Sequence, residues 1–491
     1  MPGEVLPPPC SISTRPLPDP SMNASISAGM TRRTFLGRSA AGIGSIALGS
    51  LLQNDLGAQQ GGLLTNLHHP AKAKRVIFLF MAGGPSHIDL FDPKPKLDEL
   101  DGKPIPDELL KDHQQFALIR GTPNFKRSPY AFKPRGQSGT VVSELLPHLA
   151  KVADELTVIR SMHTNTNVHD PGVNFMNSGT LLNDRPTMGA WLSYGLGSEN
   201  ADLPAYIVLT SGVSDGQPLL QSFWGNGFLK SQHAGVPFRN TGAPVLHLSN
   251  PPGVDSADRR RELDLIQWMN RRQHAIIGDP EIASRIASYE LAFRMQASVP
   301  KLADLSTEPQ HILDFYGANP SKPSLARNCL LARRLVEDGV RFIQLYDRGW
   351  DSHTDIHREH KRQCAAADRP IAALITDLKQ RGLLDDTLLI WGGEFGRTPV
   401  AQVQGKTWGR DHHPHGFTMW MAGGGVPRGH THGTTDEFGY HAVENPVHVH
   451  DLHATVLHQL GIDHKRLTYR SQGRDFRLTD VHGHVVKDLI G

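Results

Sequence analysis

AKRVIFLFMAGGPSHIDLFDPKP, residues 73–95, contains an unbroken apolar run from Val76 to Met81 that ends at two glycines and a polar loop. Such a run is typical of a strand that is buried on both faces of a parallel sheet. Three later segments repeat this order of apolar strand and polar loop: LPAYIVLTSG at 203–212, VRFIQLYDRGWDSH at 340–353 and DTLLIWGGEFGRTP at 386–399. The four segments predict strands of one sheet whose polar loops meet at the same edge.

Helical stretches separate these strands and predict the outer layers of the fold. They include ELLPHLAKVADEL at 144–156, SLARNCLLARRLVEDG at 324–339 and RPIAALITDLKQRG at 369–382. Strands that alternate with helices predict an α/β fold, a three-layer α/β/α sandwich around a mainly parallel central sheet. Residues 211–330 are less regular, and we interpret them as a helical and loop insertion with charged helices from about Asp255 to Leu305.

The composition indicates a globular protein with one large domain over residues 75–491. Of the 491 residues, 38% are hydrophobic and 20% are charged, and the formal net charge is +2 without a long basic run. This charge pattern argues against nucleic acid as a partner. The 3 cysteines form no CxxC motif, which argues against thiolate zinc sites and disulfide scaffolds. The chain contains 27 histidines, and 13 of them follow residue 407, so the histidine excess is local. Any metal must therefore be held by histidines and carboxylates.

The N-terminal region has the pattern of a twin-arginine export signal. Residues 31–52 read TRRTFLGRSAAGIGSIALGSLL, an arginine pair before a short, weakly apolar run that is too short to span a bilayer comfortably. We therefore expect a signal peptide over 30–58, a linker over 59–74, and a periplasmic or extracellular location. We interpret residues 1–29 either as a disordered leader or as the result of a wrongly assigned translation start, with Met30 as the true start. The alternative for residues 31–52 is an ordinary amphipathic helix. If the segment is an export signal, contact with the membrane is expected only if the signal stays uncleaved.

Four strand-end segments carry side chains of the kinds that bind metal ions. Mixed imidazole and carboxylate ligands suit a divalent metal, zinc first, with manganese or iron as alternatives where carboxylates dominate. The segments are 83–92, 163–179, 347–357 and the pair 392–399 and 409–417, the last of which reads GRDHHPHGF. The candidate metal ligands in them are Asp89, Asp351, His353, Glu394, Asp411, His412 and His415, and His169 is a candidate catalytic residue.

Each segment also has an interpretation without a metal. The acidic and histidine residues of 351–357 could form the N-cap of a helix, which favours Asp and Ser. Glu394 could pair with Arg397, because an unpaired buried carboxylate is costly. Residues 409–417 could be a histidine-rich surface loop. The four segments together, all at strand ends, favour a metal site.

Several of these motifs resemble those of known enzymes. DDTLLIWGGEFGRTP at 385–399 resembles the strand and loop that read Asp-His-Gly in sulfatases and alkaline phosphatases. HDPGVNFMNSG at 169–179 resembles the sulfatase nucleophile segment, with Pro171 and Gly179 in register. Together with RPTMGAWLSYGLGSEN at 185–200 and GRDHHPHGF, these motifs identify the chain as similar to an exported family, domain of unknown function 1501, of the alkaline phosphatase superfamily. The resemblance implies an alkaline-phosphatase-like fold over 75–491.

The chain departs from the superfamily pattern at three positions. His169 stands at the nucleophile position, so the formylglycine of sulfatases cannot form there. Phe395 stands where a second-strand histidine ligand is expected, and Gly83-Gly84 replace a first-strand Asp pair. The resemblance implies that Asp351, His353, Glu394 and His412 remain as ligands. Asp89 could replace the missing ligand of the first strand from further along its loop.

These residues predict an exported metal-dependent hydrolase of phosphate or sulfate esters, including esters carried on glycans. The attacking group would be a metal-activated water or His169, which could equally be a ligand or a general acid. The hydroxyl of Thr187 is a lesser catalytic candidate, whose alternative role is to cap a helix. A second hypothesis is a catalytically silent relative that binds anionic glycans or an envelope partner. A third is a structural subunit with a closed four-ligand metal site.

Overall fold

The computed structural model describes residues 61–491 apart from 107–108, 110–117, 120, 213–215, 241 and 404. The expected leader and export signal at 1–58 lie outside the described residues, as does the start of the linker. Among the helices of the described part, none combines the length and the hydropathy that a membrane span requires.

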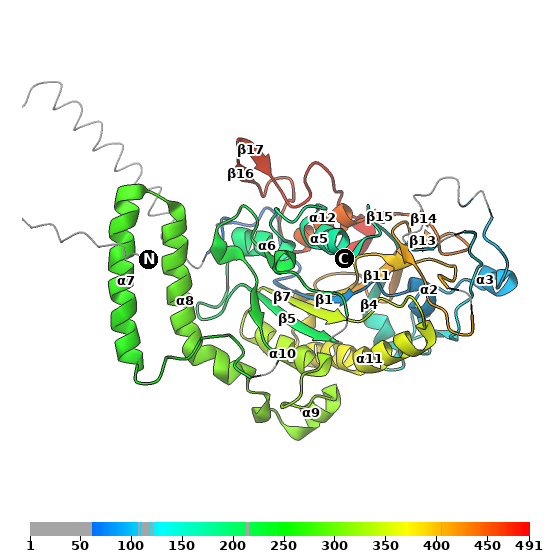
Figure 1. Cartoon of the computed structure of the whole chain (residues 1–491), viewed down its shortest axis with the longest axis horizontal. Helices are drawn as coiled ribbons and strands as arrows, with labels where there is room; N and C mark the ends of the chain where they lie inside the picture. Colours follow the sequence, from blue (N-terminus) through cyan, green and yellow to red (C-terminus); the bar gives the residue numbers. More distant parts are fainter. Residues whose placement is uncertain are drawn as a thin grey trace, which may run out of the picture. The chain divides into compact units, whose positions relative to one another are not determined.

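A nine-stranded sheet forms the middle layer of the fold (Figure 1). Its strands run in the order β12-β4-β11-β8-β1-β7-β5-β6, and β15 also pairs with β4. All pairings are parallel except those of β11 with β4 and with β8. The strands are β1 (Arg75–Ala82), β4 (Leu156–His163), β5 (Tyr206–Gly212), β6 (Val236–Phe238), β7 (Phe342–Arg348), β8 (Thr387–Gly392), β11 (Phe417–Ala422), β12 (His430–His432) and β15 (Val447–His448). The prediction of a mixed α/β fold with a mainly parallel sheet is confirmed.

Helices cover both faces of the sheet, which explains the unbroken apolar strands (Figure 1). In β1, Phe78 and Phe80 belong to the core beneath one helical layer, whereas Leu79 and Met81 belong to the core beneath the other. The first layer contains α5 (His169–Ser178), α6 (Met188–Leu196) and α12 (Val449–Gln459). The second contains α9 (Gln310–Tyr316), α10 (Leu325–Glu337) and α11 (Ile356–Gln380).

One predicted helix is largely replaced by another structure. Within residues 144–156, the helical part is a 3-10 helix, η1 (Leu149–Glu155), with a kink at Val152. The residues before Leu149 are not helical. Pro147 explains the late start, because proline lacks an N–H and disfavours helical backbone in the residue before it.

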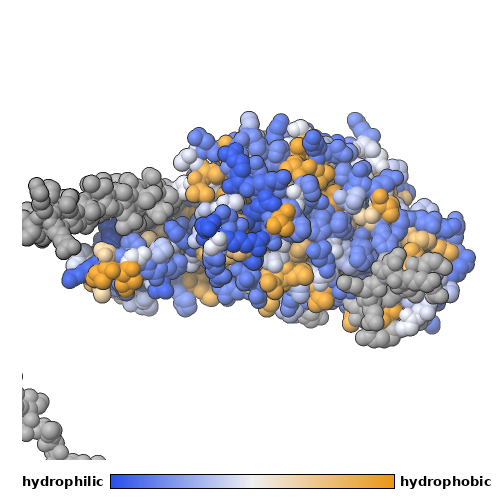
Figure 2. All heavy atoms as spheres, turned by 90° about the horizontal axis from the view of Figure 1, so that it is seen from above, coloured by the Kyte–Doolittle hydropathy of each residue, from blue (hydrophilic) through white to orange (hydrophobic). Residues whose placement is uncertain are grey.

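The range 211–330 includes a helical hairpin of α7 (Ser256–Ile277) and α8 (Pro280–Ala303). Asp255 caps α7 through a hydrogen bond from the backbone N–H of Asp258. The same range also supplies β6 at the edge of the sheet, so it is not separate from the main fold. Apolar side chains gather on the surface at the end of the molecule where the hairpin lies (Figure 2).

The remaining described elements are short. The helices α2 (His87–Leu90) and α3 (Pro95–Leu100) follow β1. Four antiparallel pairs lie outside the main sheet: β2 (Phe132–Arg135) with β3 (Thr140–Ser143), β9 (Gly396–Arg397) with β10 (His412–His413), β13 (Thr434–Thr435) with β14 (Ala442–Glu444), and β16 (Tyr469–Ser471) with β17 (Arg474–Phe476). The β9–β10 pair matters for function, because it places His412 opposite Arg397.

Candidate metal centre

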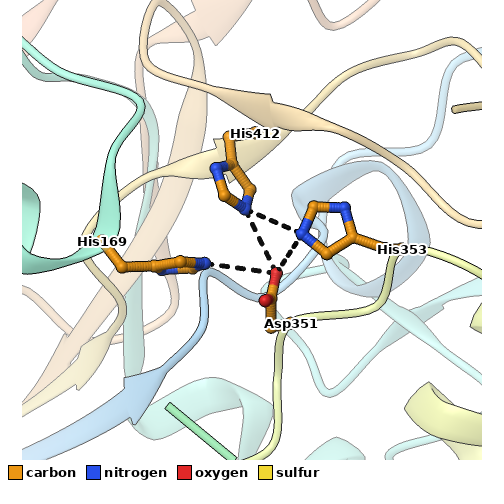
Figure 3. Close-up of side chains that lie close together, drawn as sticks. All are labelled: His169, Asp351, His353 and His412. Carbon is orange, nitrogen blue, oxygen red and sulfur yellow. Dashed lines mark hydrogen bonds and ion pairs between the residues drawn. The ribbon is translucent and has the colours of Figure 1, made fainter. Parts of the chain in front are cut away.

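Four side chains that can bind a metal meet at the carboxyl ends of the parallel strands (Figure 3). His169 is the first residue of α5, after β4; Asp351 and His353 lie in the loop after β7; and His412 lies in β10. One ligand atom from each lies within 4.8 Å of the others. Residues more than 240 positions apart in the chain thus converge because parallel strands end at one edge of the sheet.

The three imidazoles surround one carboxylate oxygen, Oδ1 of Asp351. Its distance is 2.7 Å to Nε2 of His353, 3.2 Å to Nε2 of His412 and 3.3 Å to Nε2 of His169. The Nε2 atoms of His353 and His412 are themselves 3.0 Å apart. The side chain of Asp351 is 22% exposed, so the cluster is enclosed but reachable from solvent.

Each imidazole is held from behind through its other nitrogen. Nδ1 of His412 donates to the carbonyl oxygen of Asn167 at 2.7 Å, and Nδ1 of His169 donates to Oε1 of Glu394 at 2.6 Å. Nδ1 of His353 pairs with Oε1 of Gln402. A carbonyl or carboxylate oxygen only accepts, so the hydrogen of each neutral ring sits on Nδ1 and the lone pair sits on Nε2. The three lone pairs therefore point toward the centre of the cluster.

This arrangement is the one that metal-binding histidines show in proteins, with Nδ1 bound to an oxygen and Nε2 free for the ion. Lone pairs that face each other at 3.0 Å repel, and a shared cation removes that repulsion. Nε2 of His169 is also buried without a hydrogen-bond partner of good geometry among the described residues. The donor set of His169, Asp351, His353 and His412 thus fits a divalent metal, and its three imidazoles suit zinc.

Arg397 is the positive charge of the site and is fully buried. Its Nη2 lies 2.5 Å from Oδ1 of Asp351, while Nε donates to the carbonyl oxygen of Gly84 and Nη1 to that of Arg410. The guanidinium thus fixes Asp351. It also holds the loop after β1 against the segment that leads into β10 and His412. It does not pair with Glu394 in the structure, which corrects the alternative drawn from the sequence.

The charges of the site shift the pKa values of its members. Burial would raise the pKa of Asp351, but Arg397 and the three histidines outweigh burial and hold it well below its usual range. Burial would lower the pKa of His169, but the carboxylates of Asp351 and Glu394 raise it to about 9. Burial, with Arg397 close by, lowers the pKa of His412 to about 4. Without a metal, His169 thus carries a second proton at Nε2, and a metal bound there would displace that proton.

Glu394 supports the cluster without belonging to it. Its side chain is fully buried and accepts the backbone N–H of Gly83 at 3.0 Å as well as the His169 nitrogen. Glu394, predicted as a ligand, thus lies outside the group of four side chains that could hold a metal, and its carboxylate orients His169. Phe395, beside it, packs its ring against His169 and His412, with centroids 4.9 and 4.7 Å away.

Two glycines after β1 let the backbone approach the site. Both have positive φ, +120° at Gly83 and +72° at Gly84. A Cβ on Gly83 would lie 2.5 Å from the backbone nitrogen of Asp351, and a Cβ on Gly84 would lie 2.9 Å from the ring of Phe395. Any side chain at these two positions would collide with the loop of Asp351 or with Phe395, so the close packing requires glycine.

The structure places Asp89 outside the cluster. It is fully buried and forms a two-point ion pair with Arg410, with Nε to Oδ2 at 2.7 Å and Nη2 to Oδ1 at 3.2 Å. Ser86 adds a third hydrogen bond to the carboxylate. Asp89, expected to replace a missing ligand, is thus bound to Arg410 and is not among the side chains that could hold a metal together.

Asp411 and His415 also lie outside the cluster, although both flank His412 in GRDHHPHGF. Asp411 accepts the backbone N–H groups of Leu118 at 2.8 Å and Ile119 at 3.1 Å, so it anchors a neighbouring loop. The ring of His415 packs near that of His441, with the centroids 5.8 Å apart. Neighbours of a ligand in a strand point to other sides, which is why only one residue of this histidine-rich segment reaches the site.

Thr187 precedes α6, as expected, but its hydroxyl does not cap that helix. Oγ1 donates to the carbonyl oxygen of Gly225 at 3.1 Å. This partner lies outside the cluster, and Thr187 is not among the four side chains that could hold a metal. The N-cap interpretation of 351–357 holds for Asp355, whose carboxylate accepts the backbone N–H of Arg358 at the start of α11.

Three supporting groups escape detection in the sequence. Gln402 holds His353, the backbone carbonyl of Asn167 holds His412, and Nε2 of Gln217 donates to Oδ2 of Asp351 at 2.9 Å. Amide side chains in loops and backbone carbonyls carry no chemical signature of their own, so only the folded chain reveals them.

Comparison with known proteins identifies a family. The model of the family described as "Protein of unknown function (DUF1501)" matches residues 73–490. No curated protein matches the chain.

Solved structures with a similar course of the chain belong to the alkaline phosphatase superfamily and to its sulfatases. One is a superfamily protein from Vibrio parahaemolyticus, at 12% identity and TM-score 0.33, with 81% of this chain and 68% of that chain covered. Another is the PsFucS1 sulfatase from Pseudoalteromonas sp., at 14% identity and TM-score 0.33, with coverage of 79% and 68%. A third is the C-terminal periplasmic domain of EcEptC from Escherichia coli in complex with Zn, at 9% identity and TM-score 0.34, with coverage of 81% and 84%.

Proposed function

The chain belongs to the DUF1501 family, and we propose that it is a metal-dependent hydrolase of phosphate or sulfate esters. The observation that carries the proposal is the convergence of three histidine Nε2 atoms on Asp351, each ring held by an acceptor at Nδ1. A metal bound there would polarise an ester oxygen and lower the pKa of a coordinated water toward neutrality. We propose zinc, with manganese or iron as alternatives.

The charge of the site supports an anionic substrate. Asp351 and Glu394 contribute two negative charges beside the cluster and Arg397 contributes one positive charge. A dication with neutral imidazoles leaves a net charge of about +1 in a largely enclosed space, where electrostatic attraction is stronger than in water. Phosphate and sulfate esters carry the negative charge that such a site favours, and these esters include those of glycans.

The chain's own residues orient the reaction. Glu394 fixes the tautomer of His169, and Arg397 keeps Asp351 ionised and in place. Nδ1 of His169 is bound by Glu394, and its Nε2 faces the other three side chains of the cluster, so it acts as a ligand and not as the nucleophile. Water is then the attacking group.

Metal content and ester hydrolysis test the proposal together. We expect about one zinc ion per natively produced chain and hydrolysis of p-nitrophenyl phosphate or sulfate. The variant His412→Ala should lose both, because it removes a ligand. The matched control His415→Ala, from the same segment but outside the cluster, should keep both.

Two results would count against the proposal in different ways. A wild-type protein without metal refutes the metal centre. A wild-type protein with metal that hydrolyses neither ester class refutes the hydrolase and leaves a silent metal protein that binds anionic ligands, which immobilised sulfated glycans would then detect.

We further propose that the chain is exported to the periplasm or beyond by the twin-arginine route. The support is the segment TRRTFLGRSAAGIGSIALGSLL at 31–52, with its arginine pair before a short apolar run.

A further inference from the structure

The helix α7 exposes a continuous apolar stripe. Leu265, Trp268, Met269 and Ile276 are 58%, 58%, 57% and 78% exposed. Their spacing of three, four and seven positions places them on one face of the helix. Single exposed apolar residues are common, but a contiguous stripe of this kind marks an interaction site.

The opposite face of α7 binds α8 mainly through polar groups. Arg260 reaches Glu290 of α8 with both terminal nitrogens, at 2.9 and 2.6 Å, and Gln267 bonds the same carboxylate. At 100° per residue, Arg260 and Gln267 lie about opposite Leu265 on the helix. The stripe therefore faces away from α8, and α8 lies between α7 and the sheet (Figure 1).

The residue types of the stripe suit a protein partner. Trp, Met and Arg are enriched at the centres of protein interfaces. Arg272 belongs to the same face, with its guanidinium 5.8 Å from the centroid of the Trp268 ring. Among the described residues no acidic side chain pairs with Arg272, so it is a cation in the stripe that lacks a counter-charge.

Acidic residues continue the stripe toward the start of the helix. Glu262 lies three positions before Leu265 and Asp258 four positions before Glu262, both on the stripe's face. Glu262 pairs with Arg259 at 2.8 Å within the helix, but such an exposed pair contributes little and leaves its carboxylate able to change partner. Along the helix, this face thus carries the carboxylates of Asp258 and Glu262 first, then Leu265, Trp268 and Met269, then Arg272, and finally Ile276.

We propose that this stripe pairs antiparallel with the same stripe of a second copy of the chain. When Leu265 of one copy lies opposite Met269 of the other, Glu262 lies opposite Arg272, and the symmetry of the pair repeats both contacts. This self-complementarity is what a twofold interface requires, since residue i meets j and j meets i. The antiparallel orientation also opposes the two helix dipoles favourably.

A lipid surface fits the stripe less well. Helices that lie on anionic membranes carry cations around an apolar face. Here Asp258 and Glu262 share the face with the apolar residues and pair with Arg261 and Arg259, so this end of the helix has no surplus of cations. The contact is one helix wide, so it lies at the low end of interface sizes, near about 1,000 Å², and the dimer should dissociate on dilution.

The test is the mass of the full chain in solution as a function of concentration. Sedimentation velocity over about 1–200 μM brackets a micromolar dissociation constant and should show a monomer–dimer equilibrium. The variants Glu262→Arg and Arg272→Glu each place like charges opposite each other twice and should weaken the dimer by about tenfold or more. The double variant should restore it, whereas Arg285→Glu, at an exposed arginine of α8, should leave it unchanged.

The outcomes are distinct. A wild-type chain that stays monomeric at the highest concentration overturns the proposal, and binding of that monomer to phosphatidylglycerol vesicles would assign the stripe to a membrane surface. A dimer that survives both single variants overturns the proposed face. Rescue by the double variant supports this register, because a loss of folding cannot produce it.

Discussion

Replacing Glu394 with glutamine changes one charge behind the metal cluster and little else. The side chain is fully buried, and its carboxylate accepts the Nδ1 hydrogen of His169 at 2.6 Å and the N–H of Gly83 at 3.0 Å. The amide oxygen of glutamine can accept the same hydrogens, so the loops should stay in place. What is lost is the charge that makes the bond to His169 strong and makes its Nε2 a better donor to a metal.

The expected loss of metal affinity follows from this role. Groups that orient a metal-binding histidine contribute about tenfold to a hundredfold, or about 1.4–2.7 kcal/mol. We therefore expect Glu394→Gln to bind zinc with a dissociation constant raised by that factor while the fold is kept. Competition against a chelating dye of known affinity measures it. Asp355→Asn is the control, because Asp355 lies in the same loop as Asp351 but only caps α11, a role that asparagine also fills, and its zinc affinity should be unchanged.

Two results would refute this reasoning about Glu394. An affinity within about threefold of the wild type would mean that the carboxylate does not tune His169. A loss as complete as that of Asp351→Asn would mean that Glu394 coordinates the metal itself, which the geometry does not show.

Three further predictions concern stability and location. Arg410→Met should lower the free energy of unfolding by about 3–5 kcal/mol, because it leaves Asp89 as a buried charge without its ion-pair partner, and urea denaturation measures this; a loss below about 1 kcal/mol would contradict it. Burial raises the pKa of Asp347 to about 6, above its value in the unfolded chain, so the folded state binds more protons and stability should fall as pH rises from about 4 to 6. That slope should flatten in Asp347→Asn, and an equal slope in both proteins would assign it to other groups. Changing Arg32 and Arg33 together to lysine should retain the chain in the cytoplasm on cell fractionation, and unchanged export would refute the twin-arginine proposal.

The strands were predictable where burial makes their sequence distinctive. Val76–Met81 has no polar residue because helices cover both faces of β1, and β5, β7 and β8 are likewise mostly apolar and buried. The helix expected at 144–156 failed at Pro147, whose effect on the preceding backbone outweighed the apolar periodicity of the segment. The sequence pattern thus predicted the strands whose residues are all buried, and it failed for the helix in which one proline changes the backbone.

The site was predictable in its residue types and only partly in its membership. His169, Asp351, His353 and His412 all stood among the candidates, because strand-end loops with imidazoles and carboxylates are recognisable. Asp89 fits the same pattern. What separates it from the ligands is Arg410, 321 positions away, which no local pattern connects to it.

Buried arginines decide which carboxylates at this edge of the sheet can serve a metal. Arg410 takes both oxygens of Asp89, which removes that residue from the site. Arg397 takes one contact with Asp351 but leaves the same oxygen facing three imidazoles. The ligand set is therefore richer in nitrogen than the sequence suggested, where carboxylates formed more than half of the candidate ligands. Imidazole-rich sites favour zinc over magnesium, calcium or manganese, so competition among these ions should select zinc, and preference for manganese would show that Glu394 or a further oxygen joins the ligands.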